Sequence, residues 1–282
     1  MSEQLQFWEA LLLGTIEGLT EFLPVSSTAH LTLTEKVLGY EIDAPDVTAF
    51  TAIIQLGAIL ATVIYFRDDI RRIVVALIAG LRDPGRRSGP DWRFALAVVI
   101  GSIPIGVVGL VFKDEIETTL RSLWFIGSAL ILWSGVMAYA DRTATLARDE
   151  ADVTRRDTLI IGLVQCLALI PGVSRSGATM SAGLLRGLDR VTVTRLSFFL
   201  AMPALTAATA LQIATEHENI GGGVGWPATI VATLTSFVVA YAAVAWLLRF
   251  IAGHTYTIFI AYRVALGTLV LALVASGAVG AT

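Results

Sequence analysis

Long stretches without a single charged residue dominate this sequence and restrict the folds open to it. A helix that crosses a lipid bilayer needs about 20 predominantly apolar residues. Stretches of that kind that lack Asp, Glu, Lys and Arg are residues 47–66, 94–112, 123–140, 196–215 and 220–248. Only 15% of the residues are charged, against about 25% in soluble domains. We therefore expect an all-α polytopic membrane protein, because the alternating segments of about 10 residues that are typical of a β-barrel are absent.

The arginines predict how the chain threads through the membrane. They crowd three connecting segments, 67–93, 142–156 and 186–195, and positively charged loops stay in the cytoplasm. The connections 113–121 and 215–225 have no such excess and are expected outside. The six full spans that satisfy this pattern are 47–66, 94–112, 123–140, 196–215, a helix within 226–248, and 255–277.

Two further segments are expected to enter the membrane and return on the same side. Residues 158–186 begin and end among cytoplasmic arginines, and Pro171-Gly172 interrupts them. Proline ends a helix and glycine permits a sharp turn, so we interpret this segment as a re-entrant hairpin. Residues 5–40 are interrupted in the same way by Pro24 and are expected to enter from the outside.

The two hairpin segments also resemble each other in layout. The aligned pairs are Gly14 with Gly162, Glu17 with Gln165, Ser26 with Ser174, and Ser27 with Arg175. Inverted repeats with discontinuous helices are a known membrane architecture. We expect two inverted-topology repeats, about 5–140 and 158–278, each a re-entrant helical hairpin plus three transmembrane helices, within one membrane domain, 1–282. Because non-helical backbone at that depth must be buried or line a wet cavity, the hairpin tips should face each other around a polar pocket.

The connection between the first two spans contains a further predicted helix. Residues 69–81 place apolar side chains at helical spacing, with Arg71 and Arg72 among them. A helix lying on the cytoplasmic leaflet fits this pattern, and a partner-binding helix is the alternative.

Glu17 and Glu21 lie four positions apart in the sequence and share one helix face. Two carboxylates inside a membrane repel each other unless a cation or a shared proton intervenes, and oxygen ligands suit a divalent metal. The alternative is that both are solvated near the outer headgroups.

Three hydroxyl residues, Ser26, Ser27 and Thr28, follow Pro24. Serine and threonine are preferred helix N-caps, but three in succession exceed what capping requires. His30 lies three residues beyond Ser27, and a Ser–His pair suggests an activated hydroxyl nucleophile. A hydrogen-bonded structural histidine is the simpler alternative.

Arg175 lies between Ser174 and Ser176, and the 17 residues that precede Arg175 include no charged residue. A buried arginine needs an anion, and its planar fork suits phosphate oxygens. The helix expected to begin near Ser176 would direct its N-terminal N–H groups to the same place. A salt bridge from Arg175 to a glutamate, serving only to lock the hairpins, is the alternative.

Carboxylates, hydroxyls, an imidazole, a guanidinium and two helix N-termini together meet the needs of phosphoryl transfer. The extensive lipid-facing surface favours a substrate carried on a lipid. A transporter or flippase for the same lipid is the main alternative, because broken helices and inverted repeats are typical of alternating access. An ion carrier built on Glu17 and Glu21 is a second alternative, but it leaves Arg175 without a task.

Two long motifs resemble the signatures of the undecaprenyl-diphosphate phosphatases of the bacitracin-resistance type. They are the segment from Glu17 to Leu31, EGLTEFLPVSSTAHL, and the segment from Pro171 to Thr179, PGVSRSGAT. The resemblance covers essentially the whole chain, and the one small departure is Ala29, where the family often has glycine. It implies hydrolysis of undecaprenyl diphosphate to the monophosphate carrier of peptidoglycan synthesis, with bacitracin resistance as a consequence.

The same resemblance implies roles for individual residues. Ser27 resembles the nucleophile, Arg175 the phosphate clamp and His30 the proton shuttle, although His30 could itself attack phosphorus. Glu17 and Glu21 resemble a pair that handles a metal or protons, with Mg²⁺ or Ca²⁺ as the cofactor. The residues expected to contact the substrate are Ser26, Thr28, Ser174, Ser176 and Thr179.

The resemblance also implies a location and partners. We expect a multi-pass protein of the bacterial inner membrane with a pocket that opens to the periplasm, acting on a polyprenyl diphosphate among membrane lipids and not on nucleic acid. The sequence leaves a homodimer open.

Overall fold

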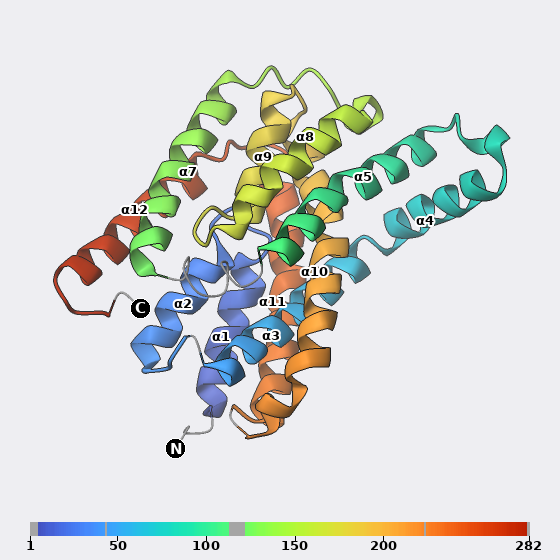
Figure 1. Ribbon diagram of the computed structural model, residues 1–282. Coiled ribbons are helices and arrows are strands. Elements are labelled where there is room, and N and C mark those ends of the chain that lie inside the picture. The colour runs from blue at the N-terminus through green and yellow to red at the C-terminus, as the bar shows by residue number, and fades with distance from the viewer. Residues whose placement is uncertain (1–4, 43, 113–121, 223, 281–282) are drawn as a thin grey trace.

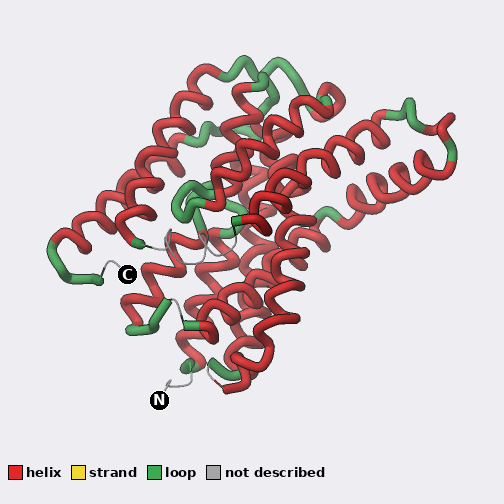
Figure 2. The backbone as a smooth tube through the Cα atoms, in the orientation of Figure 1, coloured by secondary structure: helices red, strands yellow, loops and turns green. Residues whose placement is uncertain are grey.

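The described part of the chain consists of helices joined by short connections (Figures 1 and 2). The computed structural model describes residues 5–42, 44–112, 122–222 and 224–280, without the side chains of 216–222. Eleven α-helices lie within those ranges. They are α1 Phe7–Thr20, α2 Ser27–Leu38, α3 Pro45–Tyr65, α4 Arg67–Arg82, α5 Pro90–Val111, α7 Leu123–Thr143, α8 Arg155–Gln165, α9 Arg175–Leu185, α10 Arg190–Gly222, α11 Trp226–Ile251 and α12 Thr257–Ala275.

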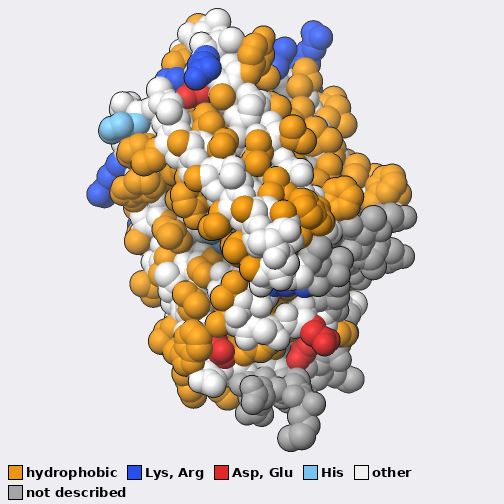
Figure 3. Space-filling model, turned by 90° about the vertical axis from the view of Figure 1, so that its left-hand side faces the viewer, with side chains coloured by type: hydrophobic (Ala, Val, Ile, Leu, Met, Phe, Trp, Pro, Cys, Tyr) orange, Lys and Arg blue, Asp and Glu red, His pale blue; other side chains and the backbone are white. Residues whose placement is uncertain are grey.

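Six of these helices are long and apolar enough to cross a membrane: α3, α5, α7, α10, α11 and α12. The six predicted spans are therefore confirmed as helices of spanning length. Figure 3 shows hydrophobic side chains spread across the middle of one face, with several Lys and Arg side chains near its upper end. A surface of this kind suits a bilayer, whose hydrocarbon core is about 30 Å thick.

The end of α10 differs from the prediction. A connection was expected from Thr215, but the helix continues to Gly222. The polar residues after Thr215 mark the end of the apolar stretch, and they remain compatible with helical backbone. The other connection expected outside, 113–121, lies outside the described residues.

Two helix pairs are too short to span, as predicted for the hairpins. The helices α1 and α2 contain 14 and 12 residues, and α8 and α9 contain 11 each. The chain turns between them at Pro24 and at Pro171-Gly172. Figure 1 shows both bends in the interior of the molecule, where the α1–α2 bend and the α8–α9 bend approach each other.

Glycines let the first helix of each pair approach a spanning helix closely. A Cβ atom on Gly14 of α1 would overlap the carbonyl oxygen of Ala232 in α11. A Cβ atom on Gly162 of α8 would likewise overlap the carbonyl oxygen of Gly101 in α5. The aligned glycines thus serve the same purpose, which is backbone-to-backbone packing as found between membrane helices.

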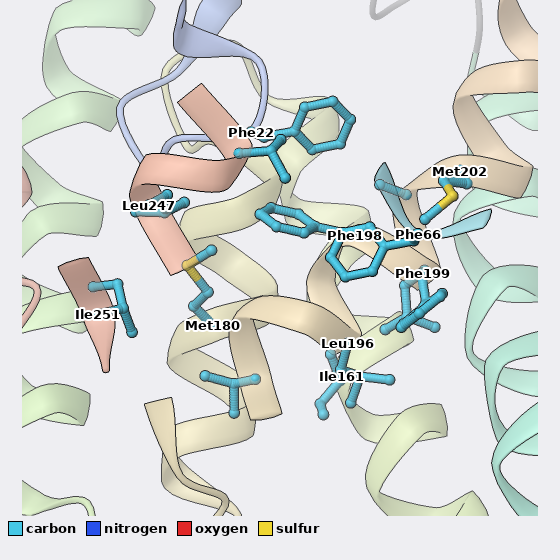
Figure 4. Packing of buried hydrophobic residues seen from close by; sticks show 14 of the residues in the cluster. Phe22, Phe66, Ile161, Met180, Leu196, Phe198, Phe199, Met202, Leu247 and Ile251 are labelled. Atoms are coloured by element: carbon cyan, nitrogen blue, oxygen red, sulfur yellow. The ribbon is translucent and has the colours of Figure 1, made fainter. Parts of the chain in front are cut away.

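An aromatic cluster anchors the first bend to α10. Phe22 lies in the bend and meets the edge of Phe198 with ring centroids 5.1 Å apart. Phe66 and Phe199 extend the cluster, with centroids 5.3 Å apart. Figure 4 shows Phe22 directed at Phe198 within this packing. Because all four rings are buried, they fix the height of the bend along α10.

The helix predicted over 69–81 is present as α4, and it packs against α5. Ile73 and Gly80 are buried, and Gly80 lies so close to Trp92 that a Cβ atom would overlap the indole ring. Four apolar side chains remain exposed: Val74, Val75, Ile78 and Leu81. The exposed apolar side chains agree with a helix at a membrane surface, and that location stays a prediction.

A buried ion-pair cluster holds the start of α8. Asp157 is fully buried and accepts hydrogen bonds from Arg148 at 2.6 Å, Arg186 at 2.8 Å and the Thr154 hydroxyl at 2.6 Å. Burial acts to raise the pKa of Asp157, but the hydrogen bonds from Arg148, Thr154 and Arg186 outweigh it and hold that pKa well below 3.8. The second hairpin is therefore fixed at its base by charge.

Candidate active site

The two bends share an unusual backbone conformation at aligned positions. Ser26 has φ 74° and Ser174 has φ 73°, a region that non-glycine residues seldom occupy. The Ser26 hydroxyl accepts a hydrogen bond from the Ala29 N–H at 3.4 Å, and the Ser174 hydroxyl accepts one from the Gly177 N–H at 3.2 Å. Each serine therefore acts as the N-cap of the following helix, as the capping alternative expected.

Capping places Ser27 and Arg175 at the first positions of α2 and α9. Both side chains contact one carboxylate. The Ser27 hydroxyl donates to Oε2 of Glu21 at 2.5 Å, and Arg175 Nη2 donates to Oε1 at 2.9 Å. The Nε2 atom of Gln55, on α3, donates to the same Oε1 at 3.1 Å. Glu21 thus connects the two bends and one spanning helix.

These groups line a cavity of about 170 Å³ between the bends. Its lining residues are Glu21, Ser26, Ser27, Thr28, Gln55, Ile105, Ala168, Leu169, Pro171, Gly172, Ser174, Arg175 and Leu205. Its polar lining side chains come from the bends and from Gln55 on α3, and apolar ones come from α5, α10 and the residues just after α8. A helix N-terminus at each bend adds partial positive charge.

Two predicted substrate contacts lie behind this cavity. The Ser176 hydroxyl donates to the carbonyl of Leu23 at 2.9 Å and so joins the two bends. The Thr179 hydroxyl donates to Ser197 on α10 at 2.7 Å. Both side chains are buried and neither lines the cavity, so the structure gives them packing contacts, and their contact with a substrate stays a prediction.

The described hydrogen bonds of the His30 ring go to Ser26 and Tyr262 and not to Ser27. Its Nδ1 lies 2.7 Å from the carbonyl oxygen of Ser26, and its Nε2 lies 2.7 Å from the hydroxyl of Tyr262 on α12. A carbonyl only accepts, so Nδ1 carries a hydrogen and the neutral ring accepts from Tyr262 at Nε2. The two rings are also stacked, with centroids 5.5 Å apart. This arrangement resembles the structural alternative, in which His30 fixes the carbonyl of Ser26.

Glu17 is buried one turn before Glu21, and its Oε1 has no hydrogen-bond partner among the described residues. Arg175 Nε is likewise buried and unpartnered there. An oxygen ligand without a partner and a guanidinium with a free donor are both suited to further ligands. Within the described ranges no group of three or more His, Cys, Asp or Glu side chains forms a metal site, so a metal held here would need additional ligands from elsewhere.

Three polar residues around the site were missed by the sequence reasoning. Gln55, Tyr262 and Arg263 each lie inside an apolar spanning helix. Gln55 lines the cavity, Tyr262 binds His30, and Arg263 is fully buried beneath the bends. These residues could have been found because a polar group inside a bilayer is costly and so indicates a function. That argument applies to an isolated polar residue as well as to a cluster.

The fold and the cavity together define a class: a polytopic helical membrane protein with a polar cavity between two bends. A guanidinium, two helix N-termini and hydroxyl groups are the donors that phosphate oxygens require. A hydroxyl that donates to a buried carboxylate has a nearby proton acceptor.

Comparison with known proteins agrees with this class. The family described as "Bacitracin resistance protein BacA" matches residues 10–269. A protein of Frankia casuarinae named "Undecaprenyl-diphosphatase 3" is 68% identical over 97% of this chain and 99% of its own length. "Undecaprenyl-diphosphatase" of Cutibacterium acnes is 52% identical over 96% and 98%, respectively. The chain belongs to the BacA bacitracin resistance family, as the two sequence motifs indicated.

Proposed function

We propose that this protein hydrolyses undecaprenyl diphosphate to undecaprenyl phosphate and inorganic phosphate. The observation that carries this proposal is the carboxylate of Glu21, which contacts both the Ser27 hydroxyl and the Arg175 guanidinium at the cavity wall. The names of the similar proteins support the substrate. The product is the lipid carrier of peptidoglycan synthesis, and its recycling would account for bacitracin resistance.

Substrate binding follows from the two sides of the cavity. Arg175 and the N-termini of α2 and α9 face the terminal phosphate, with Ser26, Thr28 and Ser174 close to its oxygens. The apolar wall of Ile105, Leu205 and their neighbours suits the prenyl chain. Arg175 can turn a donor to phosphate while one nitrogen stays on Glu21, because its Nε has no partner in the described part of the chain.

Ser27 is the nucleophile in the proposed reaction. Its Oγ attacks the terminal phosphorus while its proton passes to Oε2 of Glu21. The bond between that phosphorus and the bridging oxygen breaks, and undecaprenyl phosphate leaves as an anion with the bonding electrons. The protonated Glu21 gives this proton up to the departing undecaprenyl phosphate. Water then attacks the phosphorus of the phosphoserine and passes a proton to Glu21. The bond between phosphorus and Oγ breaks, and Oγ takes that proton back from Glu21 as inorganic phosphate leaves. His30 fixes the Ser26 carbonyl, and its own attack on phosphorus would require release from Tyr262.

Mg²⁺ or Ca²⁺ fits the donor set of this site. The unpartnered Oε1 of Glu17 and the carboxylate of Glu21 would hold the ion, with phosphate oxygens of the substrate completing its ligands, as is usual for Mg²⁺. When bound, the ion neutralises negative charge on the phosphate groups. The orphaned Glu17 oxygen supports this assignment.

We also infer two inverted repeats, about 5–140 and 158–278, and a cavity that opens to the periplasm. The shared conformation of Ser26 and Ser174 and the equivalent packing of Gly14 and Gly162 support the repeats.

Cysteines introduced at Arg87 and Glu216, in a chain without Cys166, should label from opposite sides of intact membranes. Labelling from one side would contradict the orientation. The homodimer stays a prediction.

Flipping of the same lipid is a second candidate, which the paired broken helices favour. Purified protein in detergent separates the two functions. A phosphatase releases phosphate from undecaprenyl diphosphate without a membrane to cross, and a flippase alone releases none. Phosphate release that depends on Ser27 supports the phosphatase. Folded wild-type protein that releases no phosphate would contradict the phosphatase.

A further inference from the structure

Arg263 is a fully buried cation that touches both bends. It lies on α12 and is among the largest completely buried side chains of the described residues. Its Nη2 donates to the carbonyl of Gly172 at 2.9 Å and to that of Val173 at 3.0 Å, and its Nη1 donates to the carbonyl of Pro24 at 3.4 Å. Further contacts reach Ser134 and Leu130 on α7. One side chain therefore fixes the backbone of both hairpins.

All of these acceptors are neutral. Over the described ranges, Arg263 forms no ion pair with a carboxylate, whereas Arg175 pairs with Glu21 and Arg190 with Asp141. A buried charge without a counter-ion is costly, and more so inside a membrane. Gly172 lines the candidate cavity while its carbonyl binds Arg263. The unbalanced positive charge therefore lies directly behind the wall where an anion would bind.

Arg263 also sets the direction of a peptide group at the cavity. The Val173 carbonyl points to Arg263, and the described peptide bonds are all trans. In a trans peptide the N–H points opposite to the carbonyl, so the N–H of Ser174 points away from Arg263. Ser174 lines the cavity, and none of the described residues accepts a hydrogen bond from its N–H. That N–H is available to an anion in the cavity.

We infer that Arg263 is a positioning residue of the phosphate site. It orients the Val173–Ser174 peptide so that the Ser174 N–H binds a phosphate oxygen beside Arg175, and its charge attracts the diphosphate without touching it. This inference rests on the proposed phosphatase function. Oriented backbone N–H groups and a fixed positive charge are the means by which proteins stabilise phosphate in transfer reactions.

Two substitutions separate the geometry of Arg263 from its charge. Arg263→Lys keeps the charge, but an ammonium cannot hold the carbonyls of both bends in the planar fork. Arg263→Gln keeps a donor and loses the charge. Each purified variant would be assayed for phosphate release from undecaprenyl diphosphate, for inhibition by inorganic pyrophosphate, and for thermal stability. Arg190→Lys, in the pair with Asp141 at the start of α10 and outside the lining of the candidate cavity, controls for loss of a structural arginine.

We expect Arg263→Lys to lower kcat about 10- to 100-fold, with KM and the inhibition constant for pyrophosphate within about threefold of wild type. Arg263→Gln should lower kcat similarly and also raise both KM and the inhibition constant by roughly tenfold or more. Arg190→Lys should lower thermal stability alone. The inference is overturned if both Arg263 variants lose only stability and keep the wild-type KM and inhibition constant. Wild-type protein that releases no phosphate would instead overturn the proposed function.

Discussion

Glu21 and Arg175 are separated by 154 residues, yet Arg175 Nη2 lies 2.9 Å from Oε1 of Glu21. Both side chains are largely buried, with 3% of the Glu21 and 11% of the Arg175 side chain exposed. A pair in such surroundings stabilises the contact between the bends only if its remaining polar atoms are satisfied. Ser27 and Gln55 also donate to Glu21, but Arg175 Nε has no partner among the residues that the structure describes. The pair is therefore both a link between the bends and an incomplete anion site.

Arg175→Lys tests whether the guanidinium has a task beyond this link. An ammonium can still pair with Glu21, but it cannot bind Glu21 and two phosphate oxygens with separate donors in one plane. We expect phosphate release from undecaprenyl diphosphate to fall at least about 100-fold with thermal stability nearly unchanged. Arg142→Lys, an exposed arginine at the end of α7, is the matched control. Near-normal turnover by Arg175→Lys would mean that the pair only locks the hairpins.

Substitutions of His30 separate a proton shuttle from a structural role. The side-chain amide of asparagine can replace Nδ1 of histidine and donate to the Ser26 carbonyl, but it has no proton to exchange near neutral pH. We expect His30→Asn to retain activity within about tenfold of wild type and His30→Ala to lose more. Equal losses of about 100-fold or greater in both variants would instead assign proton transfer to His30. Tyr262→Phe should change the rate only a few-fold.

The lowered pKa of Asp157 predicts how the stability of the fold depends on pH. Its pKa in the folded protein is held well below 3.8 by Arg148, Thr154 and Arg186, despite burial. The ionised form therefore stabilises the fold at pH values above about 4, and this stabilisation is lost as the pH falls below 3.8 towards the folded pKa. Asp157→Asn should lower the midpoint of thermal unfolding at pH 7 and remove most of the fall seen on acidification below pH 4. An unchanged acid dependence in Asp157→Asn would assign that fall to other carboxylates.

Two glycines in contacting helices make a matched pair for packing. A methyl group on Gly162 would overlap the backbone of Gly101 in α5, whereas nothing lies within 4 Å of the corresponding position on Gly106, also in α5. Gly162→Ala should separate α8 from α5 and lower stability by about 2 kcal/mol or more, measured as a lower midpoint of thermal unfolding. Gly106→Ala should be neutral or slightly stabilising, by up to about 1 kcal/mol. Equal effects of the two substitutions would contradict the close helix crossing.

Much of the fold could be predicted because its determinants are local. Uncharged stretches indicated five of the six spans, and Pro24 and Pro171 indicated the bends. The predicted end of α10 at Thr215 was wrong. Charged residues mark where the apolar sequence stops, but the helical backbone continues to Gly222. A polar residue is a better guide to the membrane boundary than to the end of a helix.

The site was partly predictable for a related reason. Glu21, Ser27 and Arg175 lie next to the breaks, and the expectation that the bends meet was enough to bring them together. Gln55 and Arg263 come from the middle of spanning helices, and nothing local says which neighbour they face. Ser176 follows Arg175 directly, so the helix turns its side chain about 100° away, towards the carbonyl of Leu23.

Phosphate release by Ser27→Ala is the most direct test of the proposed chemistry. The substitution removes the hydroxyl that contacts Glu21 and leaves Arg175 in place, so substrate should still bind. Ser102→Ala, which removes a hydroxyl bonded to Val98 within α5, is the control. We predict that Ser27→Ala lowers release from undecaprenyl diphosphate at least roughly 1,000-fold while Ser102→Ala stays near wild type. A Ser27→Ala protein that keeps a substantial rate would contradict attack by Ser27 and show that another group reacts with phosphorus.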